Sequence, residues 1–474
     1  MSFPSYPEYK ESGLERLGFV PIHWALYSLK RSVEGCVNGI WGDEADGEND
    51  LAVIRVADFQ RSKLRIGTKK LTYRSITNKE KEARKLRIGD LLIEKSGGGD
   101  KTLVGCVVLF EHDFGAVSSN FVARMRPLPN FDSNFLCYAF DSLYKGRVNY
   151  PSIKQTTGIQ NLDSESYLQE RFCFPSLTEQ TKIARFLDHE TAKIDTLIHE
   201  QKRLIELLKE KRQAVISHAV TKGLDPDVPM KDSGVEWLGE VPAHWGLTCI
   251  KHCCYVNDGN HGEEYPKGDD FIDGDEKGIP FIRGGNLKNM TVSQEGMLYI
   301  TPEKNQAMRK GRLLVGDILF VNRGEIGKLA VVPPSMAGAN LNSQIAYLRV
   351  TNSRIEPSFL VLYLTSDTIK ALIEAAREGS VLTQYPIANL VSIRVPVPPK
   401  DEQKKIADFL SKELHLFNTL KSEGVRNIAL LQERRSALIS AAVTGKIDVR
   451  NWQPPADESA FDGEVRQAGM ETTA

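Results

Sequence analysis

The sequence predicts an α+β protein built from two tandem, mixed and β-rich modules, each followed by a long α-helix, with the two helices pairing as a coiled coil. Three observations predict this fold. The chain repeats itself after about 220 residues, each copy contains short apolar runs bounded by turn-forming residues, and each copy ends in a long helix-favouring run. With 474 residues, 41% hydrophobic and 26% charged, the chain has ordinary globular composition and room for two to four domains.

The repeat is clearest at the opening of each copy. Residues 10–24 and 231–245 are identical at ten of fifteen positions, and His23 corresponds to His244 at an offset of 221. Further matches follow in the same order along both copies. They join 54–59 to 282–287 at an offset of 228, 89–92 to 316–319 at 227, 175–187 to 398–410 at 223, and 211–214 to 434–437. Because the offset drifts by only a few residues, we expect insertions in loops alone.

The globular parts, roughly 12–175 and 233–398, are predicted to be rich in short strands. Apolar runs such as 51–54, 103–109 and 330–332 are bounded by Gly, Asp and Asn. Helical stretches are expected between the strands, near 135–144 and 357–378.

The two end segments are predicted to be helices. Ser176 and Glu179 fit a capping box, and no Gly or Pro follows until Gly223. Apolar residues recur every seven positions, at Leu187, Ile194, Leu208 and Val215 with Leu197 and Leu204 beside them, and at Leu410, Phe417, Leu431 and Leu438 around Gly424. About 43 residues of helix would span roughly 64 Å. A paired, intramolecular coiled coil is the simplest arrangement, and two separate helices packed on their own modules are the alternative.

These patterns give five segments along the chain. They are a first module at 1–175, a helix at 176–222, a second module at 223–398, a helix at 399–447, and a polar tail at 448–474 that we expect to be disordered.

Composition excludes some classes of protein and leaves others open. The net charge of −1 and a pI near 6.8 argue neither for nor against nucleic acid, so a DNA-binding protein must gather its Lys and Arg on one face. No apolar stretch approaches 18 residues, and the first residues lack a basic-then-apolar signal, so a cytoplasmic protein is expected. Seven cysteines in a long chain fit reduced thiols.

Motifs for nucleotide, nuclease or methyltransferase chemistry are off-pattern. The stretch 97–102 reads Gly-Gly-Gly-Asp-Lys-Thr, which departs from a phosphate-binding loop at Lys95 and Asp100. Glu402 and Lys404 have nuclease-like spacing but lie in the first turn of a helix, where a capping role is expected. There is no Asn/Asp-Pro-Pro-aromatic motif of adenine methylation. We therefore expect no catalytic centre in this chain.

The cysteine and histidine motifs favour packing. Cys249, His252, Cys253 and Cys254 lie close in sequence, but paired C-x-x-C knuckles are missing and the first copy has no equivalent. Buried thiols are expected there, with no metal and no cofactor bound by this chain. The repeated Pro-x-His-Trp element has no partner nucleophile, so it also favours packing.

The remaining polar loops fit DNA reading. They recur at equivalent places in the two copies with different side chains, which predicts one scaffold reading two different sequences. Arg, Lys, Gln and Asn suit base edges, while Ser and Thr suit phosphates. The candidate DNA-binding residues are Arg55, Lys95, Ser96, Lys101, Asn120, Lys154, Gln155, Thr156 and Gln160 in the first copy, and Arg283, Asn322, Arg323, Lys328, Asn342, Gln344, Gln384 and Tyr385 in the second.

Three repeated elements resemble the specificity subunit of type I restriction-modification systems. They are the Leu-Gly-x-Val-Pro-x-His-Trp opening, the Gly-Asp-[Leu/Ile]-Leu element, and the Pro-x-x-x-Glu-Gln-x-x-Ile-Ala-x-Phe-Leu helix entry, and the resemblance covers residues 1 to about 447. It implies that each module recognises one half of a bipartite DNA site, and that the two helices pair antiparallel and fix the gap between the halves.

The resemblance also implies partners. The helices would dock two adenine-N6 methyltransferase subunits, and ATP-driven motor and nuclease subunits would join. S-adenosylmethionine, ATP and Mg are then expected on those partners. Two other classes stay open from the residues alone: a chain that is itself a restriction or methylation enzyme, and a coiled-coil scaffold that binds protein without reading DNA.

Overall fold

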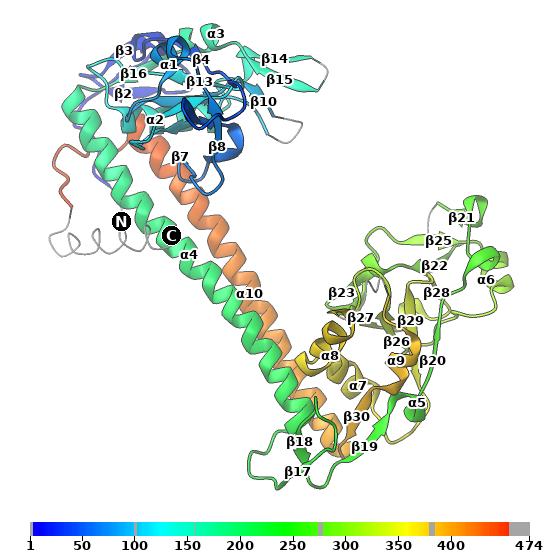
Figure 1. Ribbon diagram of the computed structural model, residues 1–474. Helices are drawn as coiled ribbons and strands as arrows, with labels where there is room; N and C mark the ends of the chain where they lie inside the picture. The colour runs from blue at the N-terminus through cyan, green and yellow to red at the C-terminus, as the bar shows by residue number, and fades with distance from the viewer. Residues whose placement is uncertain (1–2, 99–101, 157, 274–277, 379–383, 455–474) are drawn as a thin grey trace. The chain divides into compact units, whose positions relative to one another are not determined.

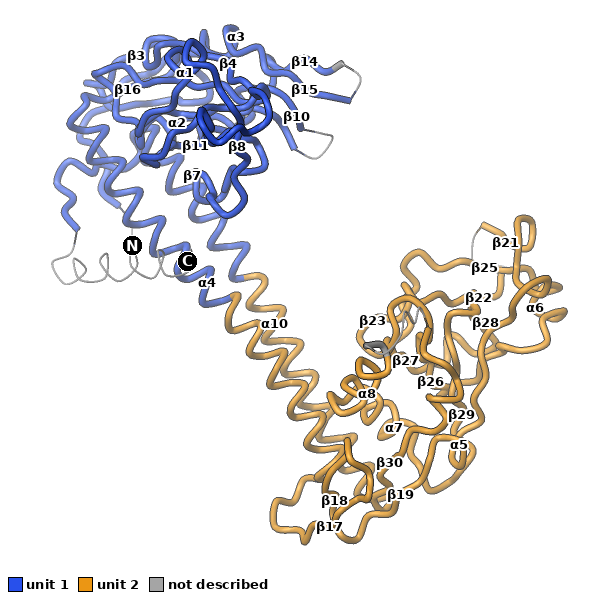
Figure 2. Tube along the Cα trace, in the orientation of Figure 1, with its two compact units in different colours: residues 1–201, 427–474 blue, residues 202–426 orange. Residues whose placement is uncertain are grey.

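The computed structural model describes residues 3–98, 102–156, 158–273, 278–378 and 384–454 (Figure 1). The chain divides into two compact units, residues 1–201 with 427–474, and residues 202–426 (Figure 2). Unit 1 contains module 1 and unit 2 contains module 2, and each unit includes parts of both long helices, α4 (Leu177–Lys222) and α10 (Lys400–Val443). The two predicted helices are therefore present, and the second ends a few residues earlier than expected.

Module 1 is built on a six-stranded sheet with a three-stranded sheet packed against it. The six-stranded sheet has the order β4 (Val37–Asn38), β13 (Val122–Met125), β9 (Leu91–Glu94), β11 (Val107–Leu109), β7 (Arg65–Ile66) and β6 (Phe59–Gln60). The three-stranded sheet has the order β12 (Ala116–Ser118), β5 (Asp50–Ile54) and β8 (Thr72–Ser75).

Smaller sheets and helices complete module 1. The sheets are β1 (Tyr9–Glu11) with β2 (Phe19–Pro21), β3 (Ala25–Ser28) with β16 (Arg171–Phe174), and β10 (Ser96–Gly97), β15 (Ile159–Leu162) and β14 (Ile153–Thr156) in that order. The α-helices are α1 (Asn78–Arg84), α2 (Ser133–Lys145) and α3 (Ser164–Gln169).

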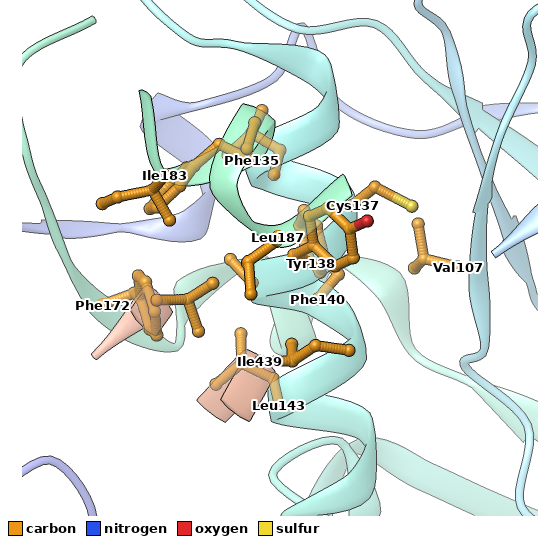
Figure 3. Packing of buried hydrophobic residues seen from close by; sticks show 14 of the residues in the cluster. Val107, Phe135, Cys137, Tyr138, Phe140, Leu143, Phe172, Ile183, Leu187 and Ile439 are labelled. Atoms are coloured by element: carbon orange, nitrogen blue, oxygen red, sulfur yellow. The ribbon is translucent and has the colours of Figure 1, made fainter. Parts of the chain in front are cut away.

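The core of unit 1 follows from the alternation of side chains along β9. Leu91 and Ile93 face one side and join the cluster that contains α2, whereas Leu92 faces the other side and joins Ile54 of the three-stranded sheet. Figure 3 shows the α2 side, where Phe135 and Phe140 of α2 lie with residues of both long helices, Ile183 and Leu187 of α4 and Ile439 of α10. The apolar run at 91–94 is thus buried on both faces.

Module 2 repeats this plan. Its six-stranded sheet has the order β20 (Cys254–Asp258), β29 (Ile345–Val350), β26 (Ile318–Val321), β27 (Leu329–Val331), β24 (Met290–Val292) and β23 (Leu287–Lys288). The second sheet has the order β21 (Phe271–Ile272), β25 (Leu298–Ile300), β22 (Ile279–Ile282) and β28 (Asn340–Leu341).

The other strands and the α-helices in the described part of module 2 are two pairs of strands and five α-helices. The strands are β17 (Met230–Asp232) with β18 (Glu240–Pro242), and β19 (Gly246–Cys249) with β30 (Arg394–Val397). The helices are α5 (Ile250–Cys253), α6 (Pro302–Ala307), α7 (Pro357–Leu364), α8 (Asp367–Glu378) and α9 (Ile387–Ser392).

A buried carboxylate joins the opening of module 1 to the first turn of α4. Glu179 is 5% exposed and accepts hydrogen bonds from the Tyr6 hydroxyl (2.7 Å) and from Trp24 Nε1 (3.1 Å), and its other oxygen lies 2.8 Å from His23 Nε2. Ser176 Oγ accepts from the Glu179 amide at 3.4 Å, so half of the predicted capping box is present. The Glu179 side chain turns to the Pro-x-His-Trp element, and this element packs as expected.

Unit 2 uses the same contact at the start of α10. Glu402 accepts from Trp245 Nε1 at 3.1 Å and its other oxygen lies 2.8 Å from His244 Nε2. The role expected for Glu402 was helix capping. The structure instead makes it the acceptor for the His-Trp pair, because the side chain on the first turn faces the module that precedes the helix.

The residue after each of these carboxylates ties the helix to the module core. Gln180 Oε1 accepts from the amide of Asp132, the N-cap of α2, at 3.0 Å. Gln403 Oε1 accepts from the amide of Glu356, the N-cap of α7, at 2.9 Å. Both glutamines are buried. The repeated Glu-Gln pair is thus explained by two structural contacts in each unit.

The α4 and α10 segments of each unit share a core. In unit 1, Ile194 and Ile198 of α4 cluster with Leu438 and Ile439 of α10. In unit 2, Ile216 and Val220, near the end of α4, cluster with residues Ile406 and Leu410 near the start of α10. The first half of each helix thus meets the second half of the other, which is the antiparallel order.

The predicted seam is partly wrong. Leu187 and Ile194 are buried, but Leu197 and Leu204, expected beside them, are 51% and 47% exposed. Ile198 and Ile205 are buried in their place, each 8% exposed. A step of three residues and a step of four lie almost equally close to one helix face, so the spacing of apolar residues did not distinguish them.

The polar tail begins later than expected. Residues 448–454 are described, and Val449 is 1% exposed in the core of unit 1. The amide of Asp448 donates to the carbonyl of Pro4 at 2.8 Å, and the Trp452 ring meets Phe186 edge-on. The rest of the predicted tail, 455–474, lies outside the described residues. Within the described part of the chain, no helix has the length and apolar character needed to cross a membrane.

Candidate nucleic-acid interface

A three-stranded ribbon carries many of the candidate residues of module 1. Strands β14 and β15 pair with Lys154 opposite Asn161, and β10 pairs with β15 with Ser96 opposite Asn161. Residues directly opposite in a sheet share a face, so Lys154, Asn161 and Ser96 form one polar row across the ribbon. Figure 1 shows this ribbon reaching out from the body of module 1.

The polar row is held by hydrogen bonds within the ribbon. Ser96 Oγ donates to Asn161 Oδ1 at 2.6 Å, and Lys154 Nζ pairs with Asp163 at 2.8 Å. The Asp163 carboxylate holds the pKa of Lys154 above its usual value, and Lys154 lowers the pKa of Asp163. Both side chains lie at the surface, so this pair orients Lys154 more than it stabilises the fold. A two-stranded ribbon is one of the elements that fit the DNA major groove.

The corresponding strand ends of module 2 carry different side chains. Arg323 forms an isolated bridge with Gln384, and the amide of Tyr385 donates to the carbonyl of Asn322 at 2.7 Å, as Leu162 does to Lys95 in module 1. Asn322 is 5% exposed, and neither its Oδ1 nor Arg323 Nε has a hydrogen-bond partner among the described residues. Polar atoms left without partners in a folded protein suit an external ligand.

Several candidate residues of module 1 have partners within the module. The Arg55 guanidinium pairs with Asp58 at 2.9 Å and donates to the Lys70 carbonyl at 3.0 Å, and Lys95 Nζ donates to Asn38 Oδ1 at 2.9 Å. Asn120 and Gln155 are exposed, whereas Gln160 is 4% exposed and accepts from the Val104 amide. Lys101 lies outside the described residues, and of Thr156 only the backbone, in β14, is described.

The candidates of module 2 also divide into exposed and buried groups. Gln344 is exposed, and Arg283, also exposed, donates to the Gly296 carbonyl at 2.7 Å. Lys328 pairs with Glu325. Asn342 is 6% exposed and holds the Gln344 amide at 3.1 Å, so it shapes the loop. Tyr385 is corrected to a packing residue, because its ring is 3% exposed and lies beside Phe320 in the core.

Sequence reasoning missed two exposed aromatic residues, Trp41 and Phe121. Their side chains are 37% and 53% exposed, and both line a cavity that also contains Arg55 and Ser96. Both lie in stretches rich in Gly, Asp, Ser and Asn, at 39–43 and 118–121, which is a signal of loop position. An aromatic residue inside such a loop could have been singled out on that ground.

The cysteines are free throughout the described chain. Cys249, Cys253 and Cys254 are buried. Among the residues that the structure describes, no group of three or more His, Cys, Asp or Glu side chains is placed to hold a metal ion. The chemistry that the described surfaces offer is hydrogen bonding, charge and aromatic contact. A repeated scaffold that carries two different polar surfaces is suited to contact two different ligand patterns.

Comparison with known proteins agrees with this interpretation. The profile of the family described as type I restriction modification DNA specificity domain matches residues 249–427. The putative type I restriction enzyme MjaX specificity subunit of Methanocaldococcus jannaschii is 24% identical over 93% of this chain and 98% of its own length. The EcoKI specificity subunit of Escherichia coli K12 is 22% identical, over 79% of this chain and 78% of its own.

Solved structures show the same fold. A chain in a structure of the type I R-M system has a TM-score of 0.64 at 16% identity and covers 90% of this chain and 99% of itself. The HsdS subunit from Thermoanaerobacter tengcongensis has a TM-score of 0.53 at 15% identity, over 92% of this chain and all of its own. Residues 249–427 thus match a type I specificity domain, and almost the whole chain is similar to type I restriction enzyme specificity subunits.

Proposed function

We propose that this chain is the DNA-reading specificity subunit of a type I restriction-modification complex, in which each module reads one half of a bipartite site. The observation that carries the proposal is the reuse of one scaffold with two different polar surfaces. Equivalent strand ends present Lys95, Ser96 and Asn161 in module 1, and Asn322, Arg323 and Gln384 in module 2. Different side chains at equivalent places read different base edges.

The long helices fix the gap between the two half-sites. At about 1.5 Å per residue, helices of 46 and 44 residues are longer than the roughly 34 Å between sites one DNA turn apart. Phosphate contacts by Lys and Arg supply affinity that does not depend on sequence, and base-edge contacts supply the discrimination.

The helices also dock partner subunits, which we propose are two adenine-N6 methyltransferase subunits. Both helices expose apolar side chains that a solvated helix face would not need. They are Leu197 and Leu430 in unit 1, and Leu204, Leu207, Leu416, Leu420 and Val425 in unit 2, each at least 39% exposed. Exposed apolar rows of this kind mark protein contacts. Specificity subunits are non-catalytic, and in this proposal S-adenosylmethionine, ATP and Mg act on the methyltransferase and motor/nuclease subunits, with this chain in the cytoplasm beside the DNA.

The test is to co-express the chain with its methyltransferase subunit and to map adenine methylation across a bacterial genome by single-molecule sequencing. We expect one motif with two short specific halves around a fixed non-specific gap. Replacing residues 12–175 with the corresponding part of another specificity subunit should change one half and leave the other half and the gap unchanged.

A stable complex without new methylation would contradict the proposal. In that case the chain would be a coiled-coil scaffold that binds protein, and it would show no salt-sensitive binding to duplex DNA. A motif whose two halves both change in the swapped protein would contradict the assignment of one half to each module.

A further inference from the structure

Module 1 has a cavity of 330 Å³ beside its reading ribbon. Trp41 and Phe121 form aromatic walls, Val56 and Ala57 add a small apolar surface, and the other lining residues include Ser96 and Gly97 of β10. Ser96 belongs to the polar row of the ribbon, so a base edge that meets this row also lies beside the cavity. Exposed aromatic residues next to a polar reading surface indicate a contact with a partly apolar ligand.

Among the described residues that line the cavity, Glu94 is the one acidic side chain, and its charge is paired. Glu94 is 1% exposed, and its carboxylate pairs with Arg61 at 2.6 Å. Burial raises the pKa of Glu94 and the Arg61 guanidinium opposes that shift. The described lining of the cavity therefore offers aromatic and small apolar surface, and its carboxylate is paired with an arginine.

A hydroxyl without a partner also belongs to the cavity wall. Ser119 is 2% exposed, and its Oγ has no hydrogen-bond partner among the described residues. A ligand oxygen that enters the cavity would give this hydroxyl an acceptor. Basic side chains lie around the cavity, since Arg55 lines it and the Arg74 guanidinium stacks 4.9 Å from the centre of the Trp41 ring. These cations are suited to the phosphates that flank a bound base.

Module 2 has polar side chains at the equivalent positions. Equivalence follows from a shared contact: a Cβ on Gly39 would lie 2.3 Å from the Ser119 carbonyl oxygen, and a Cβ on Gly259 would lie 2.5 Å from that of Asn342. Counting from these anchors, His261 stands where module 1 has Trp41, and Gln344 stands where it has Phe121. At these two positions, therefore, module 1 has aromatic side chains and module 2 has polar ones.

We propose that this cavity is a site for the major-groove edge of thymine, with Trp41 and Phe121 enclosing its 5-methyl group. In the major groove thymine presents a methyl group next to the O4 acceptor, and the cavity pairs apolar walls with one free hydroxyl donor. The inference rests on the proposed function and deepens it, because it assigns a T·A pair to the half-site of module 1 and names the side chains that select it.

The test uses the complete complex with its methyltransferase subunits and DNA containing the methylated motif. Each thymine of the half-site read by module 1 is replaced in turn by deoxyuridine, which lacks only the methyl group, and the dissociation constant is measured by fluorescence anisotropy. We expect one position at which the replacement weakens binding about fourfold, the value of one buried carbon group. In Phe121→Ala and Trp41→Ala complexes this sensitivity should disappear, and Phe121→Leu should keep part of it.

Ile159→Ala is the matched control, because Ile159 is an apolar ribbon residue of similar exposure that does not line the cavity. It should leave the deoxyuridine effect intact, and Gln344→Ala should do the same. A half-site of module 1 without thymine, or a deoxyuridine effect that persists in both aromatic variants, would overturn the inference while leaving the proposed function standing. Failure of the unmodified duplex to bind with sequence preference would overturn both.

Discussion

In both units a glutamate on the first turn of a long helix contacts the His-Trp pair of the module, but the burial of this contact differs. In unit 1 the Glu179 carboxylate contacts three polar side chains, and the Glu179 side chain alone is 6% exposed. In unit 2 the Glu402 carboxylate contacts two, and its side chain is 26% exposed. The third donor is Tyr6, which stands where module 2 has Asp227. The carboxylate thus contacts the His-Trp pair with the same geometry in both copies, but it is more deeply buried in unit 1. We therefore expect the contact to stabilise unit 1 more than unit 2.

The largest expected effect is at Glu179. Glu179→Ala leaves the buried Trp24 indole and Tyr6 hydroxyl without an acceptor, so we expect a loss of about 4 kcal/mol in the local stability of unit 1. Glu402→Ala should cost about 1–2 kcal/mol in unit 2, since water reaches that site. Hydrogen exchange measured peptide by peptide gives the loss of local stability in each unit. Equal losses in the two units would contradict the expected difference.

The glycine that follows each long helix gives the next largest effect. Gly445 has φ of +75°, and a Cβ there would lie 2.3 Å from Pro21 Cδ. Gly223 has φ of +81°, but its nearest neighbours would be 3.3 Å away, at Glu402 and Trp245. We expect Gly445→Ala to cost about 3 kcal/mol and Gly223→Ala about 1–2 kcal/mol, because both adopt a left-handed backbone but only the first collides with a ring. Thermal unfolding of the two variants checks the order.

A third pair separates the buried and exposed faces of α4. Ile198→Ala empties part of the core of unit 1 and should cost about 2–3 kcal/mol. Leu197→Ala, one residue away and 51% exposed, should cost under about 0.5 kcal/mol. If Leu197 contacts a methyltransferase subunit, its variant should weaken that complex in a titration with purified partner, and unchanged binding would remove Leu197 from the docking surface.

The smallest expected effect compares two arginines at equivalent helix positions. Arg435 pairs with Asp195 at 3.1 Å. Arg212 is the equivalent of Arg435, but the equivalent of Asp195 is the uncharged Asn418. Arg212 Nε has no hydrogen-bond partner among the described residues. Arg212 lines a cleft of 490 Å³ with Lys288, Lys328 and Lys370. We expect Arg212→Gln to lower the salt dependence of DNA binding by about one phosphate contact.

Arg435→Gln is the control for Arg212→Gln. It should cost about 1 kcal/mol of stability and leave the salt dependence unchanged, because its charge is already balanced by Asp195. A plot of binding constant against salt concentration for both variants measures this. Equal slopes for the two variants would show that Arg212 faces no phosphate.

The sequence predicted more of the fold than of the candidate site. Repetition at a nearly constant offset located both modules and both helices, because a duplicated core needs the same apolar spacing twice. The site was harder to predict: Tyr385 and Asn342 have side-chain types that suit DNA, but the structure buries them. Polarity indicates which groups could bind a ligand, and only packing determines which of them reach the surface.

The sequence by itself determined the two-module order, the bounds of the helices to within a few residues, and the resemblance to type I specificity subunits. These features are local or repeated, so they can be read from spacing and side-chain type alone. The tertiary structure decided three further points: that Glu179 accepts from the His-Trp pair, that Ile198 faces the core in place of Leu197, and that Trp41 and Phe121 enclose a cavity. Each of these depends on residues far apart in the chain, whose contacts are fixed only when the separate elements pack together.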